Sequence, residues 1–146
     1  MSRWPDDTQR PLTPKGERRH RKVGKRLRRL GLVPTLLLTS PWRRAWQTAE
    51  ITAEEMNCPA PVATEALATP PTIARISGAI GTRPHDAIIA LVGHEPWLSE
   101  LAARLLTGKA DGMAIDFPKS GVMGLSVDTL GAGNAVLDFF LRPKAE

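Results

Sequence analysis

The sequence of 146 residues predicts an α/β fold with a mostly parallel central sheet flanked by helices. Three observations predict it. Short apolar runs typical of buried strands alternate with amphipathic runs typical of helices. Prolines stand at or just before the starts of several expected helices, where they are best tolerated. The last two apolar runs enclose a glycine turn, which favours neighbouring strands. The length suits a single domain over residues 1–146.

The first helix is expected over residues 14–30. Thr13 suits its N-cap, and Pro14 suits its first position because the amide hydrogen that proline lacks would have no partner there. Gly31 suits its end. Residues 35–39, TLLLT, form a short apolar run before a turn and so predict a buried strand.

A second helix is expected to follow that strand directly. Ser40 is expected to cap it and Pro41 to open it, and the residues WRRAWQTAEITAEEM continue it. A short strand is expected near Val62. A further helix over residues 72–80 should end at Gly81, where the apolar pattern breaks.

The second half of the chain repeats this order. Residues 86–92, DAIIALV, predict another buried strand, and the helix WLSELAARLLTG follows over residues 97–108. Residues 121–127 and 135–141 are two short apolar runs around a glycine turn. They predict a terminal hairpin or two neighbouring strands.

Several protein classes are not expected. The longest apolar runs fall far short of the about 20 residues that a membrane-spanning helix needs. The first residues contain no apolar core of a secretory signal. We therefore expect a cytoplasmic protein with no membrane contact. The single cysteine, Cys58, cannot form an internal disulfide or a thiolate metal site, so a partly buried thiol is expected.

The net charge of +5 is concentrated in residues 15–29, KGERRHRKVGKRLRR. Such a run can neutralise nucleic-acid phosphates. Its apolar residues Val23, Leu27 and Leu30 recur at helical spacing, however, and His20 extends their stripe to the edge of the core. Because no aromatic platform accompanies the run, a solvated basic helix face is favoured and a nucleic-acid partner is not expected.

Two segments place distinctive side chains at the carboxyl ends of expected strands. Arg43 and Arg44 fall in the opening turn of a helix, and His94 stands on the strand-to-helix turn VGHEPW. Ligands of open α/β sheets bind at such ends. A guanidinium binds phosphoryl oxygens in bidentate fashion, and an imidazole adds one donor. The pattern favours an anion site; the alternatives are a solvated Arg44 and a His94 that merely caps its helix.

At these stretches the sequence resembles the histidine phosphatase superfamily, and in particular the small SixA-type phosphohistidine phosphatases. The matching stretches are WPDDTQRPLTPKGERR, LLLTSPWRRAWQTAEI, VATEALAT, ALVGHEPWLSELAARLLTG and FPKSGVMGLSVD. The resemblance implies that Arg44 binds the transferring phosphoryl group and that His94 stabilises its charge in the transition state. It places Arg10 at the mouth of the site. It implies no metal and no cofactor.

The chain departs from the family at its start. Family members open with an apolar strand that ends in Arg-His-Gly or Arg-His-Ala, whose histidine is the nucleophile. This chain begins at Met1, past that motif. His20 lies within a helix and His85 near the amino end of its strand, so neither replaces it. We expect an N-terminally truncated domain with no nucleophile in this chain, lacking the first strand, on the order of 10 residues.

The resemblance implies a phosphatase that removes phosphate from a phosphohistidine on a signalling protein, through a phosphohistidine enzyme intermediate. Two alternatives stay open. One is a phosphomonoesterase of small metabolites in the same superfamily, and the other is a non-catalytic module that binds phosphate or a phosphoprotein. Glu65 and Glu95 are the two candidates for a general acid, and neither is assigned.

Overall fold

The computed structural model describes residues 6–144, so the expected start of the domain at Met1 lies outside the described residues. In chain order the elements are η1 Asp7–Gln9, α1 Pro14–Arg29, β1 Leu36–Thr39, α2 Arg43–Met56, β2 Val62–Ala63, η2 Glu65–Leu67, α3 Ile73–Ile80, β3 Ile89–Val92, α4 Trp97–Thr107, β4 Val122–Ser126 and β5 Val136–Leu141. Each predicted helix and strand is present.

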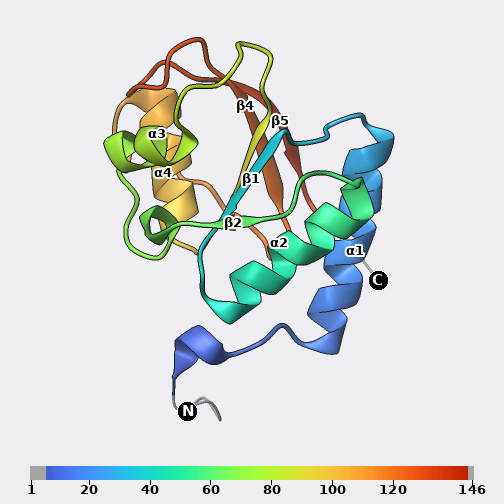
Figure 1. The fold of residues 1–146 in the computed structure, drawn as a ribbon. Coiled ribbons are helices and arrows are strands. Elements are labelled where there is room, and N and C mark those ends of the chain that lie inside the picture. Colours follow the sequence, from blue (N-terminus) through green and yellow to red (C-terminus); the bar gives the residue numbers. More distant parts are fainter. Residues whose placement is uncertain (1–5, 145–146) are drawn as a thin grey trace.

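The predicted α/β fold is confirmed. Strands β2, β1 and β3 form a parallel sheet in that order, in which Leu38 of β1 is opposite Val62 on one side and Leu91 on the other. Strands β4 and β5 form a separate antiparallel pair. Helices α3 and α4 lie on one side of the strands, and α1 and α2 lie on the other (Figure 1).

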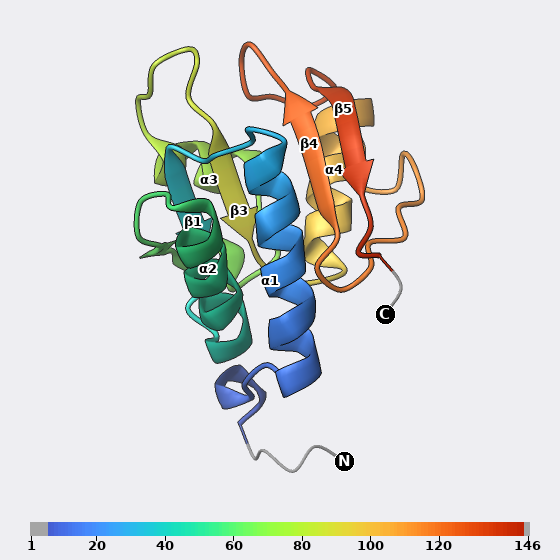
Figure 2. The same cartoon turned by 90° about the vertical axis from the view of Figure 1, so that its right-hand side faces the viewer.

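The two sheets meet at strands that do not pair. In Figure 2, helix α1 lies in front of the strands, with β3 to its left and β4 to its right. β3 pairs only with β1, and β4 pairs only with β5, among residues 6–144. The expectation of a buried strand over residues 86–92 was therefore wrong in part. The strand covers Ile89–Val92 and is half-buried along its length, because one of its edges has no neighbour.

The predicted start of helix α1 is confirmed. The Thr13 hydroxyl accepts a hydrogen bond from the Gly16 amide at 3.0 Å, and Pro14 occupies the first turn. Val23 and Leu27 are buried against α2, and six of the basic side chains are exposed. The exposed ones are Lys15, Arg18, Lys22, Lys25, Arg28 and Arg29.

Helix α2 begins later than predicted. Its first residue is Arg43, and Trp42 takes the N-cap position that the sequence suggested for Ser40. The reason lies in the preceding strand. The Ser40 amide donates to the Val92 carbonyl at 2.9 Å, which continues the pairing of β1 with β3 by one residue and delays the turn. The Ser40 hydroxyl then accepts from the Trp42 amide at 3.2 Å.

The core consists of two apolar clusters. The larger one joins the sheet to α3 and α4, and its buried members are Leu36, Leu38, Ala66, Leu67, Ile76, Leu101, Leu105 and Ala135. The smaller one joins α1 to α2 around Val23, Leu27 and Met56. Cys58 packs at the margin of the smaller cluster as a free, partly buried thiol, and this burial raises its pKa.

His20 lies deeper than predicted. It is buried rather than at the edge of the core, and both ring nitrogens have partners. Nε2 lies 2.7 Å from the Thr52 hydroxyl of α2, and Nδ1 lies 3.2 Å from the Ser120 hydroxyl. These two bonds offset the cost of burying a polar ring. Within residues 6–144, the helices are too short or too polar to cross a membrane.

Candidate active site

The site lies where β1 and β3 end side by side. Thr39 is opposite Val92 in this parallel pair, so the residues that follow each strand emerge at the same edge of the sheet. After β1 the chain enters α2, which carries Arg44 in its first turn. After β3 it turns at His94 and enters α4. The register of two strands thus brings the two predicted anion-binding residues to one place.

His94 is fixed to the end of β1 by a hydrogen bond. Its Nε2 lies 2.8 Å from the hydroxyl of Ser40, which is itself fully buried. The pKa of His94 is lowered to about 4, first by burial and then by the nearby Arg44 charge, while Asp7 opposes the change. The ring is therefore neutral near pH 7, so it can donate one hydrogen bond to an anion without carrying a charge of its own.

Two tryptophans surround His94. Trp42 packs against the imidazole with 4.4 Å between ring centroids, and Trp97 meets it edge-on at 6.0 Å. The two indoles are 6.2 Å apart. The guanidinium carbon of Arg44 also lies over the Trp42 ring, 5.1 Å from its centroid. Arg44 and His94 therefore contact the same indole, which brings the predicted pair together.

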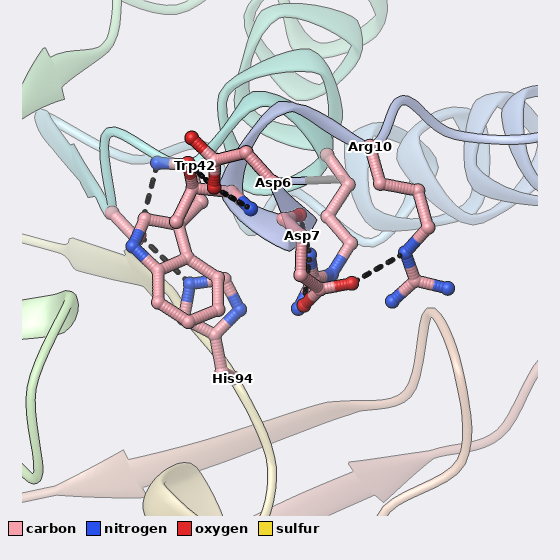
Figure 3. Close-up of polar contacts among 8 residues, drawn as sticks. Asp6, Asp7, Arg10, Trp42 and His94 are labelled. Carbon is pink, nitrogen blue, oxygen red and sulfur yellow. Dashed lines mark hydrogen bonds and ion pairs between the residues drawn. The ribbon is translucent and has the colours of Figure 1, made fainter. Parts of the chain in front are cut away.

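Asp7 binds both arginines of the predicted site. Arg44 donates to the Asp7 carbonyl at 3.0 Å and lies 3.3 Å from its carboxylate, and Arg10 Nε lies 3.0 Å from the other carboxylate oxygen. Figure 3 shows Asp7 reaching toward Arg10 on the side of the cluster opposite His94. The Asp7 side chain is 53% exposed and that of Arg44 is 23% exposed, so the cluster is open to solvent.

The segment that carries Asp7 and Arg10 is held in place locally. The Asp6 carboxylate accepts from the Thr8 amide at 3.0 Å and so caps η1. The Leu12 amide donates to the Gln47 side chain of α2 at 2.7 Å. These bonds hold η1, and with it Arg10, beside the start of α2.

Glu65 and Glu95 also follow strand ends at this edge of the sheet, whereas His20 and His85 lie away from the cluster. Glu95 accepts from the amide and hydroxyl of Ser99, so its carboxylate is used at the start of α4. Glu65 is exposed at the beginning of η2. His85 precedes β3 and is exposed beside Asp128, at 4.0 Å, at the end of the strand opposite His94. His20 is enclosed between α1 and α2.

Sequence reasoning missed three members of the cluster: Asp7, Ser40 and Trp42. Asp7 stands three residues before Arg10, a spacing that lets both side chains meet across one turn of η1. The sequence predicts Ser40 as a helix cap, whereas the structure places it at the carboxyl end of β1 with its hydroxyl bonded to His94. Trp42 carried no chemical signal, since an aromatic residue next to a core is ordinary.

The donor groups of the cluster are of the kind that suits an oxyanion. The described residues contain no group of three or more histidine, cysteine or acidic side chains placed to hold a metal ion. The cluster has two guanidiniums and a neutral imidazole as donors. Such donors bind phosphoryl oxygens and stabilise the charge that develops on them during transfer.

The chain is similar to known proteins over most of its length. The sequence profile of the Histidine phosphatase superfamily (branch 1) matches residues 2–68. An uncharacterized protein of Picosynechococcus sp. (strain PCC 7002) is 38% identical over 124 residues, which cover 84% of this chain and 74% of that protein.

Solved structures share the fold. The protein histidine phosphatase SixA, complexed with tungstate, superposes with a TM-score of 0.80 at 23% identity, over 98% of this chain and 90% of that one. A protein of Agrobacterium tumefaciens assigned as a phosphohistidine phosphatase SixA gives a TM-score of 0.77 at 20% identity, with the same coverage. These two structures show that the chain has the fold of SixA. The profile match over residues 2–68 shows that the chain belongs to the histidine phosphatase superfamily.

Proposed function

We propose that this domain is a phosphohistidine phosphatase of the SixA type that acts on a phosphohistidine of a signalling protein. One observation carries the proposal. Arg44 and His94, which come from different strand ends, pack on the same Trp42 ring at one edge of the sheet. A guanidinium and a neutral imidazole at such a place form a binding site for a phosphoryl group.

The proposed roles follow from the chemistry of each group. The Arg44 guanidinium holds two phosphoryl oxygens, and it exchanges its exposed ion pair with Asp7 for the more highly charged substrate. His94 donates a hydrogen bond to a third oxygen. Because its ring is held by Ser40 and Trp42, this donor is in place before charge develops in the transition state. Arg10 attracts the anion at the mouth of the site.

The nucleophile in this proposal is a histidine from outside residues 1–146. His20 is buried and His85 lies at the opposite end of β3, while His94 serves the phosphoryl oxygens. The unpaired edges of β3 and β4 support a place for the strand that would carry such a histidine, because a strand between them would pair with both.

The reaction proceeds in two steps. The nucleophilic imidazole forms a new P–N bond as the P–N bond of the substrate breaks, and the departing electron pair stays on the substrate nitrogen, which takes a proton from water. Water then attacks the enzyme phosphohistidine and releases inorganic phosphate. A phosphoramidate nitrogen is readily protonated, so a dedicated acid such as Glu65 or Glu95 is not required.

The substrate is a protein side chain in this proposal. The cluster is exposed at the sheet edge, where the Asp7 side chain is 53% exposed, and this leaves room for a side chain of another protein. The second candidate function is a non-catalytic module that binds phosphate or a phosphoprotein. The observation that favours it is that Arg44 and His94 lie together, whereas His20 is buried and His85 lies at the opposite end of β3.

A hydrolysis assay tests the proposal. Phosphate release from a phosphohistidine-containing protein domain is measured for residues 1–146 and for the product of the same gene extended upstream of Met1. We expect release, and a labelled enzyme intermediate that is stable to alkali and lost in acid, only with the extended protein. Hydrolysis of sugar phosphates but not of phosphohistidine would support the metabolite phosphatase instead. Binding of phosphoprotein without turnover by either protein would support the binding module.

Two variants of the extended protein check the residue roles. Arg44→Ala and His94→Ala should each reduce turnover by on the order of 100-fold or more, as the loss of a transition-state donor does. Arg43→Ala is the matched control, because Arg43 is the exposed neighbour of Arg44 in the same helical turn. Near-normal turnover of the Arg44 or His94 variant, or equal losses in all three, would contradict the assignment.

A further inference from the structure

Trp42 contacts both members of the proposed phosphate-binding pair. Its ring lies 4.4 Å from the His94 ring, with an interplanar angle of 39°, and 5.1 Å from the guanidinium carbon of Arg44. The first distance is that of a tilted stack, and the second is within the range of a cation–π contact. Figure 3 shows the Trp42 and His94 rings packed together, on the side of the cluster away from Arg10.

The backbone of Trp42 is tied to His94 as well. Its amide donates to the Ser40 hydroxyl at 3.2 Å, and that hydroxyl is bonded to His94 Nε2 at 2.8 Å. Trp42 is also the N-cap residue of α2, so its position fixes where the helix that carries Arg44 begins. Trp42 is therefore linked to His94 through its ring and through Ser40. It is linked to Arg44 through its ring and through the start of α2.

We propose that Trp42 is a positioning residue that sets the placement of Arg44 and His94 for binding a phosphoryl group; this rests on the proposed function of that pair. An arginine side chain is flexible, and ordering it at the moment of binding reduces affinity. The indole face orders the guanidinium beforehand. It also excludes water from one side of the imidazole, which keeps His94 neutral and able to donate.

Trp97 is a weaker candidate for this role. It meets the His94 ring edge-on at 6.0 Å, and its ring contacts are with His94 and Trp42 rather than with Arg44. The two tryptophans are therefore expected to have different effects on the pair. Replacing Trp42 should affect both members of the pair, whereas replacing Trp97 should affect the surroundings of His94 alone.

The experiment measures binding of inorganic phosphate and of tungstate to residues 1–146 by calorimetry, so it does not depend on a nucleophile. Trp42→Leu removes the flat ring, Trp42→Met keeps an unbranched side chain of useful size in case the leucine variant folds poorly, and Trp42→Phe keeps an aromatic face. Trp46→Phe, one turn further along α2, is the matched control. Circular dichroism verifies the fold of each variant.

We expect Trp42→Leu and Trp42→Met to weaken phosphate binding about 10-fold, and Trp42→Phe to stay within about threefold of the unchanged protein. The pKa of His94, followed by NMR of its ring protons, should rise from about 4 toward 6.5 in the leucine variant, because water then reaches the ring. A role limited to packing would lower stability without this change of pKa.

Unchanged phosphate affinity and unchanged His94 pKa in both the leucine and methionine variants would overturn the proposal. Arg44→Ala, measured in the same assay, shows whether the role of Trp42 or the proposed phosphate site itself is wrong. If Arg44→Ala weakens phosphate binding and the Trp42 variants do not, the site stands and the role of Trp42 is wrong. If Arg44→Ala leaves phosphate binding unchanged, the proposed site itself is wrong, and the Trp42 proposal fails with it.

Discussion

Asp7 is the residue that most directly controls the charge of the site. Its carboxylate neutralises part of the Arg44 and Arg10 charge, and it raises the pKa of His94 against the effects of burial and of Arg44. In the proposed site, a phosphoryl group competes with this carboxylate for the same guanidinium. We therefore expect Asp7 to set how strongly this cluster attracts anions.

Replacing this carboxylate should strengthen anion binding. We expect Asp7→Asn to raise the affinity for inorganic phosphate by roughly threefold to tenfold at low salt, with a smaller effect at high salt, since the ion pair is partly exposed. Asp6→Asn is the control, because asparagine caps a helix as well as aspartate does and Asp6 bonds Thr8 rather than an arginine. Weaker phosphate binding by Asp7→Asn would mean that Asp7 chiefly orients the arginines.

The two histidines with lowered pKa values make stability depend on pH. Burial lowers the pKa of His20 and that of His94 from 6.5 to about 4. Between these values the unfolded chain binds more protons than the folded one, so stability is full above about pH 6.5 and falls as the pH decreases toward 4. For the deeply buried His20 this loss amounts to at most about 3 kcal/mol.

Urea unfolding at several pH values between 7 and 4 measures this dependence. His20→Gln should flatten the curve, although it also costs stability at pH 7 through the bonds to Thr52 and Ser120. His85→Gln should leave the curve unchanged because His85 is exposed. Stability that is equal at pH 7 and pH 4.5 would show that neither ring is held neutral in the folded protein.

At the scale of elements, the contact between α1 and α2 depends on a glycine. A Cβ atom added to Gly24 of α1 would lie 2.8 Å from the Cβ of Glu55 of α2, closer than such atoms approach in proteins. The two helices therefore pack nearer to each other than side chains at this position permit. This closeness also brings His20 of α1 within reach of Thr52.

Gly24→Ala should lower the free energy of unfolding by about 1–3 kcal/mol, because the helices must move apart. Gly78→Ala in α3 is the matched control. Its added Cβ would meet no atom within 4 Å, and alanine favours helix over glycine, so that variant should be as stable as the unchanged protein or up to about 1 kcal/mol more stable. Thermal or urea unfolding measures both. A tolerated Gly24→Ala would indicate that Glu55 and its helix shift easily.

Local signals predicted some elements and missed others for identifiable reasons. The cap at Thr13 and the stop after α1 depend on nearby residues only, and both were correct. The start of α2 was predicted too early, because the Ser40 amide bonds to Val92, a residue distant in the sequence. The sequence predicts the pair Arg44 and His94, whereas the contacts of Asp7 with Arg44 and of Trp42 with His94 arise from tertiary packing.

At the scale of the whole molecule, the described residues contain two sheets that end in unpaired edges. In a parallel strand the amides point alternately to the two sides. The carbonyls of Ile88 and Val92 accept bonds from the β1 side, so by alternation the amides of Ile89 and Leu91 point to the open edge of β3. Unpaired groups of this kind are costly when buried and invite pairing when exposed.

Hydrogen exchange of residues 1–146 tests this arrangement directly. The amides of Ile89 and Leu91 should exchange at least about 100-fold faster than those of Ala90 and Val92, which face β1. In a protein that supplies a strand between β3 and β4, the same two amides should become protected. Equal protection of all four amides in residues 1–146 would show that the edge of β3 is already covered.

The bond from the Ser40 amide to the Val92 carbonyl fixes the end of β1 relative to β3. The position of Arg44 relative to His94 therefore depends on the number of residues between Thr39 and Arg44. One extra residue between Thr39 and Arg44 would turn the guanidinium by about 100° around the axis of α2 and away from His94. Length changes in the surface segment over residues 109–120 would leave that geometry untouched. Natural variation in chain length should therefore be frequent in the latter segment and rare in the former.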